Sequence, residues 1–582
     1  MQKRGADLVI DVLKAEGVEV VFGHPGGAIM EVYDALYLDG SIKHVLARHE
    51  QGAGHMAEGY AKVSGKVGVA MSTSGPGATN LVTAIADAYM DSVPVVFITG
   101  QVPTHLIGND AFQEVDIVGI TRPITKHSIL VKRGEDLALA LRQAFYIAKT
   151  GRPGPVLVDI PKDITQKPAP AYVPSEKEVL DSIPGYSPHV EPNAQQIRKA
   201  LSLLLEAKRP VLYIGGGAVS SEAQEELVKL AEKLNIPATT TNMGKGAFPE
   251  EHHLSLHMLG MHGTYYANMA VYNCDLLIAV GARFDDRVTG KVEEFAPNAK
   301  IIHIDIDPAS ISKNIIVDVP IVGDVKVVLR RLLSELEKTN LELPPERRQW
   351  VENILDLKRR YPLRYERSST LIKPQFVIER IHTLTKGKAY ISAGVGQHQM
   401  WAAMFYKYSF PRQFINSGGL GTMGFGLPAA IGAKVAKPDH EVFVIDGDGS
   451  FMMTMQELIT AVQYRIAVKV AIINNAYLGM VRQWQELFYQ KRYSEVDLSL
   501  QPDFVKLAES CGAVGLRAKT PNEVDEVISK ALEINDRPVV MDFHVDREEN
   551  VLPMVPAGKS YRDMILEDGR KGVEAETMYL VG

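Results

Sequence analysis

The residues best suited to chemistry form two polar turns, each of which follows an apolar, strand-like run. The first turn is Gly-Asp-Gly-Ser at 447–450, and the second is Asn-Asn-Ala-Tyr-Leu-Gly at 474–479. Neighbouring parallel strands end at the same edge of a sheet, and that edge is where α/β proteins bind ligands. Asp448 and Asn475 would bring one carboxylate and one carboxamide oxygen there. This sparse oxygen set suits Mg²⁺, which keeps waters and completes its octahedron with phosphate oxygens.

The glycines beside Asp448 would let the backbone approach a diphosphate, and a helix opening near Ser450 would present N–H groups to it. A Gly-Asp-Gly tripeptide alone is more often only a turn. Its combination with the Asn-Asn turn, one strand–helix–strand unit later, favours a metal–diphosphate anchor. The pattern resembles the anchor motif of thiamine diphosphate (ThDP) enzymes. That resemblance implies contacts with the cofactor or the metal from Gly449, Ser450, Asn475, Met480 and the backbone carbonyl of Tyr477.

Glu50 is a second candidate, because it begins a helix pattern rich in Ala and Gly. A Glu at a helix start is usually explained by the helix dipole. An enzyme that uses ThDP, however, needs one carboxylic acid against the pyrimidine ring, in a poorly hydrated pocket that raises the carboxyl pKa and permits proton sharing. The resemblance to ThDP enzymes assigns this role to Glu50.

The resemblance runs through nearly the whole chain and is to the acetolactate synthase family, also called acetohydroxyacid synthase. In the N-terminal third the matching segments are Phe-Gly-His-Pro-Gly-Gly-Ala at 22–28, Arg-His-Glu-Gln-Gly-Ala-Gly at 48–54, Thr-Ser-Gly-Pro-Gly-Ala-Thr-Asn at 73–80, 98–103, Ala-Phe-Gln-Glu at 111–114 and 151–162. It implies catalytic positions at Glu50, Gln113 and Gly27. It also implies that Phe112 and Lys162 line the substrate site or its entrance.

The Gly-rich run 418–426 matches the segment that bends ThDP in this family. Gly421 and Met423 are the implied contacts, with Met423 wedged between the two rings of the cofactor; a Met in such a loop is otherwise mostly a gap-filler. Gln397 and His398, just past the strand-like run 390–392, match residues on the diphosphate side.

The middle of the chain carries a possible flavin site. The triple glycine at 215–217 lacks the full spaced dinucleotide fingerprint and is weak by itself. The run Gly-Ala-Arg-Phe-Asp-Asp-Arg-Val-Thr-Gly at 281–290 resembles a mark of the FAD-containing members of the family. Without that match, its Arg and Asp residues would be a solvated ion-pair network. The implied FAD contacts are Arg152, Gly216, Thr241, Met243, Leu259, His262, Gly281, Arg283, Asp285, Asp305 and Asp324. Because the reaction needs no redox step, this FAD is expected to be structural.

The resemblance implies a transferase that decarboxylates pyruvate and joins the two-carbon unit to pyruvate or 2-ketobutyrate, in the first common step of valine, leucine and isoleucine biosynthesis. Arg287 would hold the acceptor carboxylate and Trp484 would favour the larger ketone. Three alternatives stay open. Pyruvate oxidase would pass electrons to the flavin, and a 2-ketoacid decarboxylase would release an aldehyde. A catalytically dead nucleotide-binding or regulatory protein would keep only the fold.

Composition narrows the class of protein. The chain has 582 residues, 46% hydrophobic residues and a net charge of −7, without a basic stripe, so we expect a globular protein that binds no nucleic acid. It has neither a signal peptide nor an apolar run of transmembrane length, which makes cytoplasmic the default location. The lone Cys274 and Cys511 exclude a disulfide framework and a Cys-based zinc cluster.

Strand-like runs alternate with helical patterns from end to end, which predicts an α/β protein with three doubly wound parallel sheets. The strand-like runs are 67–71, 95–99, 156–160, 211–214, 276–280, 301–304, 442–445, 468–473 and 539–543. Pro-rich 168–192 and charged 342–373 are interpreted as linkers. The predicted domains are a pyrimidine-binding domain at 1–166, a central FAD-associated domain at 190–345, a diphosphate- and Mg²⁺-binding domain at 370–550 and a tail at 551–582 that helps cover the site. In the family the two cofactor halves meet between subunits, which implies a homodimer or tetramer, and a separate small regulatory subunit is a further expectation.

Overall fold

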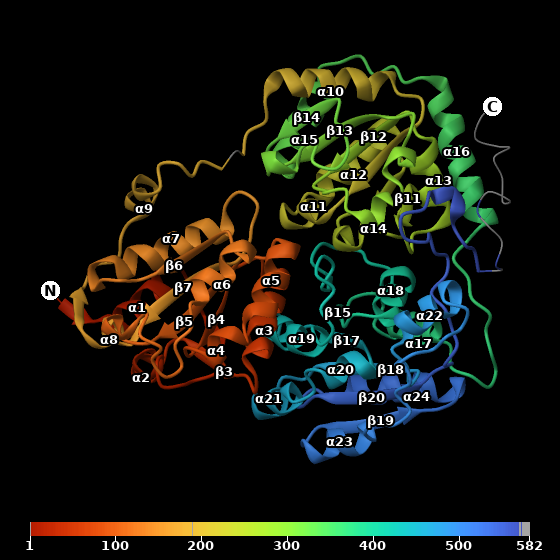
Figure 1. Cartoon of the computed structure of the whole chain (residues 1–582). Helices are drawn as coiled ribbons and strands as arrows, with labels where there is room; N and C mark the ends of the chain where they lie inside the picture. Colours follow the sequence, from red (N-terminus) through yellow and green to blue (C-terminus); the bar gives the residue numbers. More distant parts are fainter. Residues whose placement is uncertain (1, 189, 568, 570–571, 573–582) are drawn as a thin grey trace.

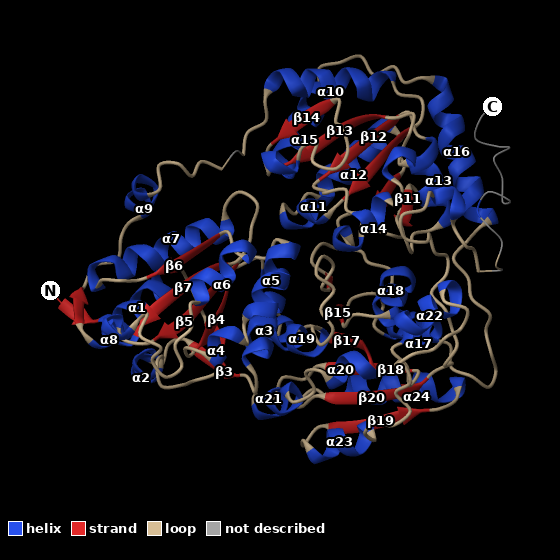
Figure 2. Ribbon diagram, in the orientation of Figure 1, coloured by secondary structure: helices blue, strands red, loops and turns tan. Residues whose placement is uncertain are grey.

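A computed structural model of the chain describes residues 2–188, 190–567, 569 and 572. It contains three six-stranded parallel sheets with helices on both faces (Figure 1, Figure 2). The predicted fold class is therefore confirmed. Each of the nine strand-like runs coincides with a strand, because long β-branched and apolar stretches suit positions that are buried on both faces of a sheet. The last residues of the predicted tail, 573–582, lie outside the described residues.

The first sheet has the order β3-β2-β4-β5-β7-β6. Its strands are β2 (Val20–Gly23), β3 (Lys43–Leu46), β4 (Gly68–Ser72), β5 (Val95–Gln101), β6 (His127–Leu130) and β7 (Val156–Pro161). Its helices include α1 (Gly5–Ala15), α2 (Met30–Asp39), α3 (Glu50–Ser64), α4 (Pro76–Thr79), α5 (Val82–Asp91), α6 (Ile117–Thr121), α7 (Leu137–Lys149) and α8 (Lys162–Gln166). One face packs on α1 and α7, and the other packs on α3 and α5, so the helix that begins with Glu50 lies between this sheet and the rest of the molecule.

The middle sheet has the order β11-β10-β9-β12-β13-β14. Its strands are β9 (Pro210–Ile214), β10 (Ala238–Thr240), β11 (Ser255–Met258), β12 (Leu276–Val280), β13 (Lys300–Asp305) and β14 (Val319–Val322). The helices are α10 (Ala194–Glu206), α11 (Gly216–Ser220), α12 (Gln224–Leu234), α13 (Tyr265–Asn273), α14 (Asp286–Thr289) and α15 (Val325–Glu337). Strands β9 and β12 pair although they are not consecutive, so the strand order reverses between them. In doubly wound sheets, ligands commonly bind at the carboxyl ends of the strands at such a point.

The third sheet has the order β16-β15-β17-β18-β20-β19. Its strands are β15 (Tyr390–Ala393), β16 (Phe414–Ile415), β17 (Val442–Gly447), β18 (Lys469–Asn474), β19 (Val514–Ala518) and β20 (Val539–His544). The helices are α17 (Pro374–Leu384), α18 (Gln397–Phe405), α19 (Gly426–Ala436), α20 (Asp448–Met452), α21 (Glu457–Gln463), α22 (Gly479–Phe488), α23 (Phe504–Ser510) and α24 (Pro521–Glu533). Strands β17 and β18 are direct neighbours in parallel register, as the two polar turns require.

The two segments interpreted as linkers contain secondary structure, which corrects that part of the prediction. Residues 168–170 form β8, which pairs antiparallel with β1 (Gln2–Arg4), and α9 (Glu176–Ser182) follows. The charged segment contains the sixteen-residue helix α16 (Pro345–Arg360), which buries Trp350, Ile354 and Leu357 against the middle domain. The charged residues of α16 outnumber its apolar residues, and they obscure the amphipathic period in the sequence.

Helices α3 and α19 cross in close contact and join the first domain to the third (Figure 1). A Cβ atom at Gly59 would collide with the backbone of Ala429, and one at Gly432 would collide with the backbone of Met56. Small residues on both helices therefore allow the backbones to touch. The tail joins the middle domain to the third, because Val555 donates its N–H to the carbonyl of Met261 at 2.7 Å.

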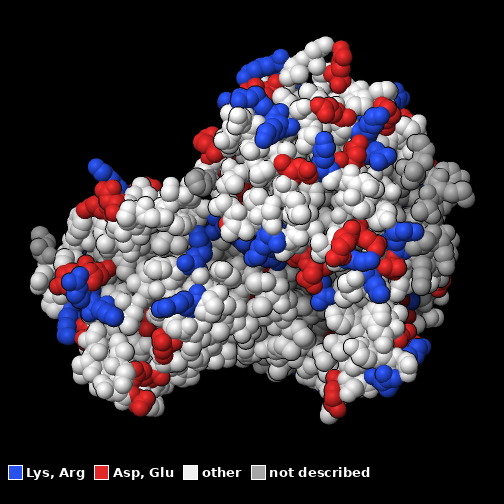
Figure 3. All heavy atoms as spheres, turned by 45° about the horizontal axis from the view of Figure 1, so that its top comes forward, with Lys and Arg blue, Asp and Glu red and all other residues white. Residues whose placement is uncertain are grey.

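Positive and negative side chains are interspersed over the face drawn in Figure 3. Among the described residues, no helix combines the length and the apolar character that crossing a bilayer would require.

Candidate active site

Asp448 and Asn475 stand at the ends of the neighbouring strands β17 and β18, and both side chains are buried. Burial raises the pKa of Asp448 to about 7, and the nearby carboxylates of Asp542 and Asp446 act in the same direction. Asp448 Oδ2 is buried without a hydrogen-bond partner. A buried acceptor of this kind is costly unless a proton or a cation satisfies it, so the turn is chemically suited to a metal ion.

The predicted residues Gln397 and His398 lie against this pair. Asn475 Nδ2 donates to Gln397 Oε1 at 3.1 Å, and Gln397 Nε2 donates to Gln483 Oε1 at 2.9 Å. His398 Nε2 lies 3.4 Å from Asp446 Oδ1, and a Cβ atom at Gly447 would lie 2.7 Å from His398 Nδ1. The structure therefore brings the start of α18 to the edge of the sheet that carries both polar turns.

The Gly-rich loop lies over the same edge. Gly421 has φ 75°, a left-handed conformation that favours glycine. The Ser450 hydroxyl accepts the N–H of Gly424 at 3.0 Å, so the loop is fastened to α20 directly after Met423. A Cβ atom at Gly449 would lie 3.8 Å from the Met423 methyl, which places the predicted wedge beside the predicted anchor.

Glu50 is the first residue of α3, as predicted, and only 8% of its surface is exposed. Asn80 Nδ2 donates to Glu50 Oε2 at 2.9 Å. A Cβ atom at Gly77 would lie 3.3 Å from Glu50 Oε1, and one at Gly75 would lie 2.8 Å from the carbonyl oxygen of Gln113. The turn 73–80 therefore places Gln113 near Glu50, while Phe112 is 88% exposed.

Glu457 also belongs to this site, although no motif in the sequence points to it. Its carboxylate accepts the N–H groups of Arg48 at 3.1 Å and of His49 at 3.0 Å, directly before Glu50. Thr460 donates to the same carboxylate at 2.8 Å. Helix α21 of the third domain thus fixes the start of α3. No described hydrogen bond or ion pair joins Glu50 to Asp448 or Asn475.

Arg287 of the middle domain contacts Trp484 of the third domain. The guanidinium carbon of Arg287 lies 5.4 Å from the centroid of the Trp484 ring, within the range of a cation–π contact. Arg287 Nη1 lies 3.5 Å from Met261 Sδ, and the side chain is 53% exposed. The structure therefore joins the two predicted acceptor-site residues and leaves guanidinium N–H groups available to a ligand.

The predicted FAD residues fall into two groups. The loops after β9 and β12 pack together, and a Cβ atom at Gly217 would lie 2.7 Å from the Cα atom of Gly281. Leu259 and His262 are buried nearby, and burial lowers the pKa of His262 to about 4. Other predicted contacts have local structural roles, because Thr241, Asp285 and Asp324 each accept a backbone N–H at the start of a helix.

The remaining predicted residues are distributed around these loops. Arg152 Nη1 lies 3.4 Å from Asp307 Oδ2 and so links the first domain to the middle one. Asp305 accepts the N–H of Asp307 at 2.9 Å. Gly216 opens α11 beside Met243, Lys162 opens α8, and Met480 lies in the first turn of α22. Arg283 donates to the carbonyl of Met90 in the first domain.

Comparisons with known proteins agree with this arrangement. The N-terminal TPP binding domain, the central domain and the C-terminal TPP binding domain of thiamine pyrophosphate enzymes match residues 3–120, 197–332 and 394–543. The fold and the site thus define a thiamine pyrophosphate enzyme.

Comparison with individual proteins shows which family of thiamine pyrophosphate enzymes the chain belongs to. The acetolactate synthase of Mycobacterium leprae is 55% identical over 96% of this chain and 90% of its own length. The acetolactate synthase large subunit of Haemophilus influenzae and the acetolactate synthase isozyme 3 large subunit of Escherichia coli are each 50% identical over 97% of this chain and 98% of their own lengths. This chain belongs to the acetolactate synthase family.

Proposed function

We propose that this chain decarboxylates pyruvate and transfers the resulting two-carbon unit to a second 2-ketoacid, as the catalytic subunit of an acetolactate synthase. The products are 2-acetolactate from pyruvate and 2-aceto-2-hydroxybutyrate from 2-ketobutyrate, which supply branched-chain amino acid biosynthesis. The observation that carries the proposal is the Arg287–Trp484 contact, because an acceptor needs both a cation for its carboxylate and a wall for its alkyl group.

The residues at both ends of the site fit ThDP. Glu50 is a buried carboxyl with one oxygen engaged by Asn80, which leaves the other for a ring nitrogen. Gly449, Ser450, Asn475 and Met480 would hold the diphosphate end, and Gly421 and Met423 would hold the middle. When bound, ThDP supplies an electron sink for cleavage of the carbon–carbon bond beside a ketone. Glu50 would hold a proton at the pyrimidine ring.

Mg²⁺ fits the turn at Asp448. Its buried Oδ2 atom has no protein donor, and the carboxamide oxygen of Asn475 accepts only the N–H of Tyr477, at 3.1 Å, so a lone pair remains. The metal would take these two oxygens and the carbonyl of Tyr477, with phosphate and water oxygens completing the octahedron. Because the pKa of Asp448 is about 7, loading the site near neutral pH would displace a proton.

FAD would bind at the carboxyl ends of β9 and β12, the point of strand reversal, where glycines bring two loops together. Gly216, Gly281 and Arg283 would hold it there, with Leu259 and His262 as buried walls. Carboligation transfers no electrons to a flavin, so the group would serve to hold the middle domain against the Gly-rich loop.

Specificity would come from the acceptor side. The guanidinium of Arg287 would bind the acceptor carboxylate, and the indole of Trp484 would contact its alkyl group. One additional methylene on such a wall changes the free energy of the transition state by about 1–3 kcal/mol. Phe112, Gln113, Gly27 and Lys162 would line the rest of the site and help exclude water, which would otherwise protonate the reacting two-carbon unit.

We also propose that this chain assembles into a homodimer or tetramer. Glu50 has described partners in the first domain and Asp448 in the third, so a second copy would supply the missing half of each site in a homodimer or tetramer. The named relatives include large subunits, which supports a separate small regulatory subunit as a partner of this chain. The division into domains at 1–166, 190–345 and 370–550 stays a proposal.

An acceptor competition tests the function. The purified chain, loaded with ThDP, Mg²⁺ and FAD, is given pyruvate and 2-ketobutyrate together, and the products are separated by mass spectrometry. We expect both hydroxy-ketoacids, and we expect Arg287→Gln to lose both while ThDP stays bound. Acetaldehyde as the main product would instead indicate a decarboxylase, and acetate with a reduced flavin would indicate an oxidase.

A further inference from the structure

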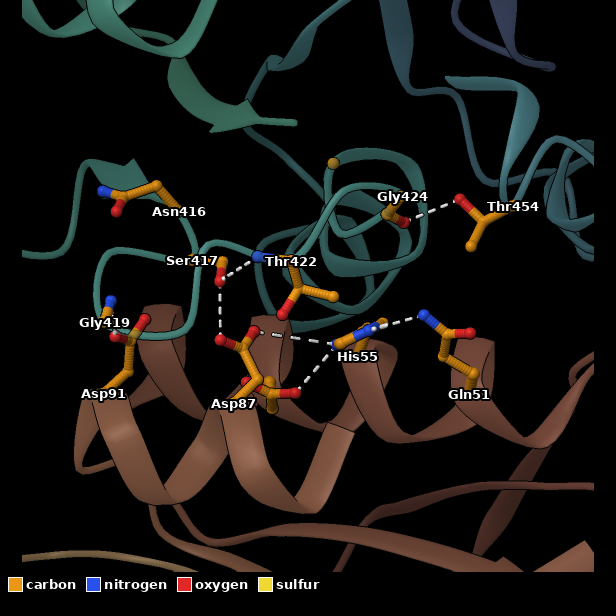
Figure 4. Close-up of polar contacts among 12 residues, drawn as sticks. Gln51, His55, Asp87, Asp91, Asn416, Ser417, Gly419, Thr422, Gly424 and Thr454 are labelled. Atoms are coloured by element: carbon orange, nitrogen blue, oxygen red, sulfur yellow. Dashed lines mark hydrogen bonds and ion pairs between the residues drawn. The ribbon is translucent and has the colours of Figure 1, made fainter. Parts of the chain in front are cut away.

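A fully buried polar network lies between the first domain and the Gly-rich loop (Figure 4). His55 and Glu58 come from α3 and Asp87 comes from α5, and all three side chains are completely buried. Their facing nitrogen and oxygen atoms lie within 4.8 Å of one another. Above them runs the backbone from Asn416 to Gly424. The function proposed above uses none of these three side chains.

The three side chains form one polar group in which the imidazole is neutral. His55 Nδ1 lies 2.9 Å from Glu58 Oε1, and burial lowers the pKa of His55 to about 4, so this ring stays neutral and donates its one N–H. Glu58 Oε2 and Asp87 Oδ2 are both buried without a donor. One proton held by either carboxyl and shared with the other would satisfy both acceptors. Burial raises the pKa of both groups well above the ordinary range, in keeping with this sharing.

Other charges face the network from the elements packed on it. Lys62 of α3 forms an ion pair with Asp91 of α5 at 2.6 Å and donates to the carbonyl of Asn416. Asp91 accepts the N–H groups of Gly418 and Gly419 at 3.1 and 2.7 Å. This pair therefore holds the first residues of the loop, and the Lys62 ammonium also attracts the carboxyls of Glu58 and Asp87.

Asp87 holds the next part of the loop through the side chain of Ser417. The Ser417 hydroxyl donates to Asp87 Oδ1 at 2.6 Å and accepts the N–H of Thr422 at 2.8 Å. Gly424 is then fixed from the opposite side, because Thr454 donates to its carbonyl at 2.6 Å. Between these fastenings lie Gly421 and Met423, the two loop residues proposed to contact ThDP.

We propose that Asp87 is a positioning residue for the cofactor, which sets the conformation of Gly421 to Met423 through the Ser417 hydroxyl. This inference rests on the proposed ThDP role of the loop. Asp87 itself touches neither cofactor nor substrate. One proton shared with Glu58 would let the Asp87 carboxyl remain so deeply buried while its other oxygen accepts from Ser417.

The test measures the loop and not only turnover. Asp87→Ala, Asp87→Asn, Ser417→Ala and the double variant Asp87→Ala/Ser417→Ala are loaded with ThDP, Mg²⁺ and FAD. The exchange rate of the C2 proton of bound ThDP is followed by NMR after acid quench. This rate reports how the cofactor is held before any substrate binds. Thr121→Ala is the matched control, since its buried hydroxyl donates at 2.7 Å to a carbonyl of its own helix.

We expect Asp87→Ala and Ser417→Ala each to slow C2 exchange about tenfold or more, since small displacements of positioned groups cost up to about a hundredfold. The double variant should lose no more than either single variant, because the two side chains act through one hydrogen bond. Asp87→Asn should recover most of the loss, since its amide oxygen still accepts from Ser417 and its N–H₂ replaces the shared proton. Thr121→Ala should exchange at the parent rate.

Several results would overturn the inference. Parent-like exchange in Ser417→Ala, or additive losses in the double variant, would show that the loop is positioned by other contacts. A stoichiometric metal ion found in the purified protein by elemental analysis, and lost in Asp87→Ala, would make the three side chains a metal site instead. Failure of the unsubstituted chain to bind ThDP would refute the proposed function itself, and that outcome is distinguishable from the others.

Discussion

Replacing Glu50 by Gln removes the carboxyl proton chemistry and little else. The side chain is nearly isosteric, and the amide oxygen of Gln can still accept from Asn80 Nδ2, which donates to Glu50 at 2.9 Å. The site is 8% exposed, so water would not replace the lost acid. Positioned general acid–base catalysis contributes about 10²–10⁴ in rate, equivalent to about 3–5 kcal/mol of activation free energy. We expect C2 exchange and turnover to fall by a factor in this range.

Binding should behave differently from turnover in this variant. The diphosphate end would still be held by Asp448, Asn475 and Mg²⁺, so the Kd of ThDP, measured by titration calorimetry, should change less than about fivefold, or about 1 kcal/mol. The matched control is Glu176→Gln, because Glu176 is also the first residue of a helix but is exposed. Both variants lose the same helix-dipole interaction, worth about 0.3–1 kcal/mol. Exchange and turnover within twofold of the parent in Glu50→Gln would refute the reasoning.

Four further outcomes follow from the structure. Asp448→Ala should abolish the Mg²⁺ dependence of ThDP binding seen by calorimetry, and a parent-like metal requirement would exclude Asp448 as a ligand. Trp484→Leu should lower the ratio of 2-aceto-2-hydroxybutyrate to 2-acetolactate by about 5- to 150-fold, or 1–3 kcal/mol, in competition assays; an unchanged ratio would remove Trp484 from the acceptor wall. Glu250 is buried against Lys245. Burial by itself raises the pKa of Glu250, but the charge of Lys245 leads the interactions that together lower this pKa to about 2. The ionised carboxylate therefore stabilises the fold fully above pH 4.5, and this stabilisation is lost as pH falls toward 2. Glu250→Gln should therefore flatten the acid limb of a thermal unfolding profile by up to about 3 kcal/mol, and parallel profiles would contradict this assignment. Arg347→Met should lower the free energy of unfolding by about 3 kcal/mol, since the buried guanidinium donates to the carbonyls of Leu204, Ala207 and Leu234 at the ends of two helices; an unchanged denaturant midpoint would contradict it.

Much of the site could be predicted because its chemistry is local in sequence. The turns at Asp448 and Asn475 follow long β-branched strands, and parallel strands place both turns at one edge of a sheet. Glu50 begins its helix where the Ala- and Gly-rich pattern begins. In these places, the strand and helix signals and the motif coincide.

Other features of the site and the fold could not be predicted, because they depend on contacts between segments that are distant in the sequence. Glu457 and Asp87 look like ordinary helical acids in the sequence, and only tertiary packing brings them to Arg48 and Ser417. The sequence does not predict helix α16, because its many charged residues obscure a narrow apolar stripe. Thr241, Asp285 and Asp324 stay predicted FAD contacts, and the structure shows in addition that each is a helix N-cap, a position that these residue types prefer.

The stoichiometry of the reaction tests the central claim most directly. The loaded chain is given pyruvate alone, and the CO₂ released, the pyruvate consumed and the 2-acetolactate formed are measured in the same sample. Carboligation predicts two pyruvate molecules consumed for each CO₂, with 2-acetolactate equal to the CO₂. One pyruvate consumed for each CO₂, with acetaldehyde or acetate in place of 2-acetolactate, would contradict the account.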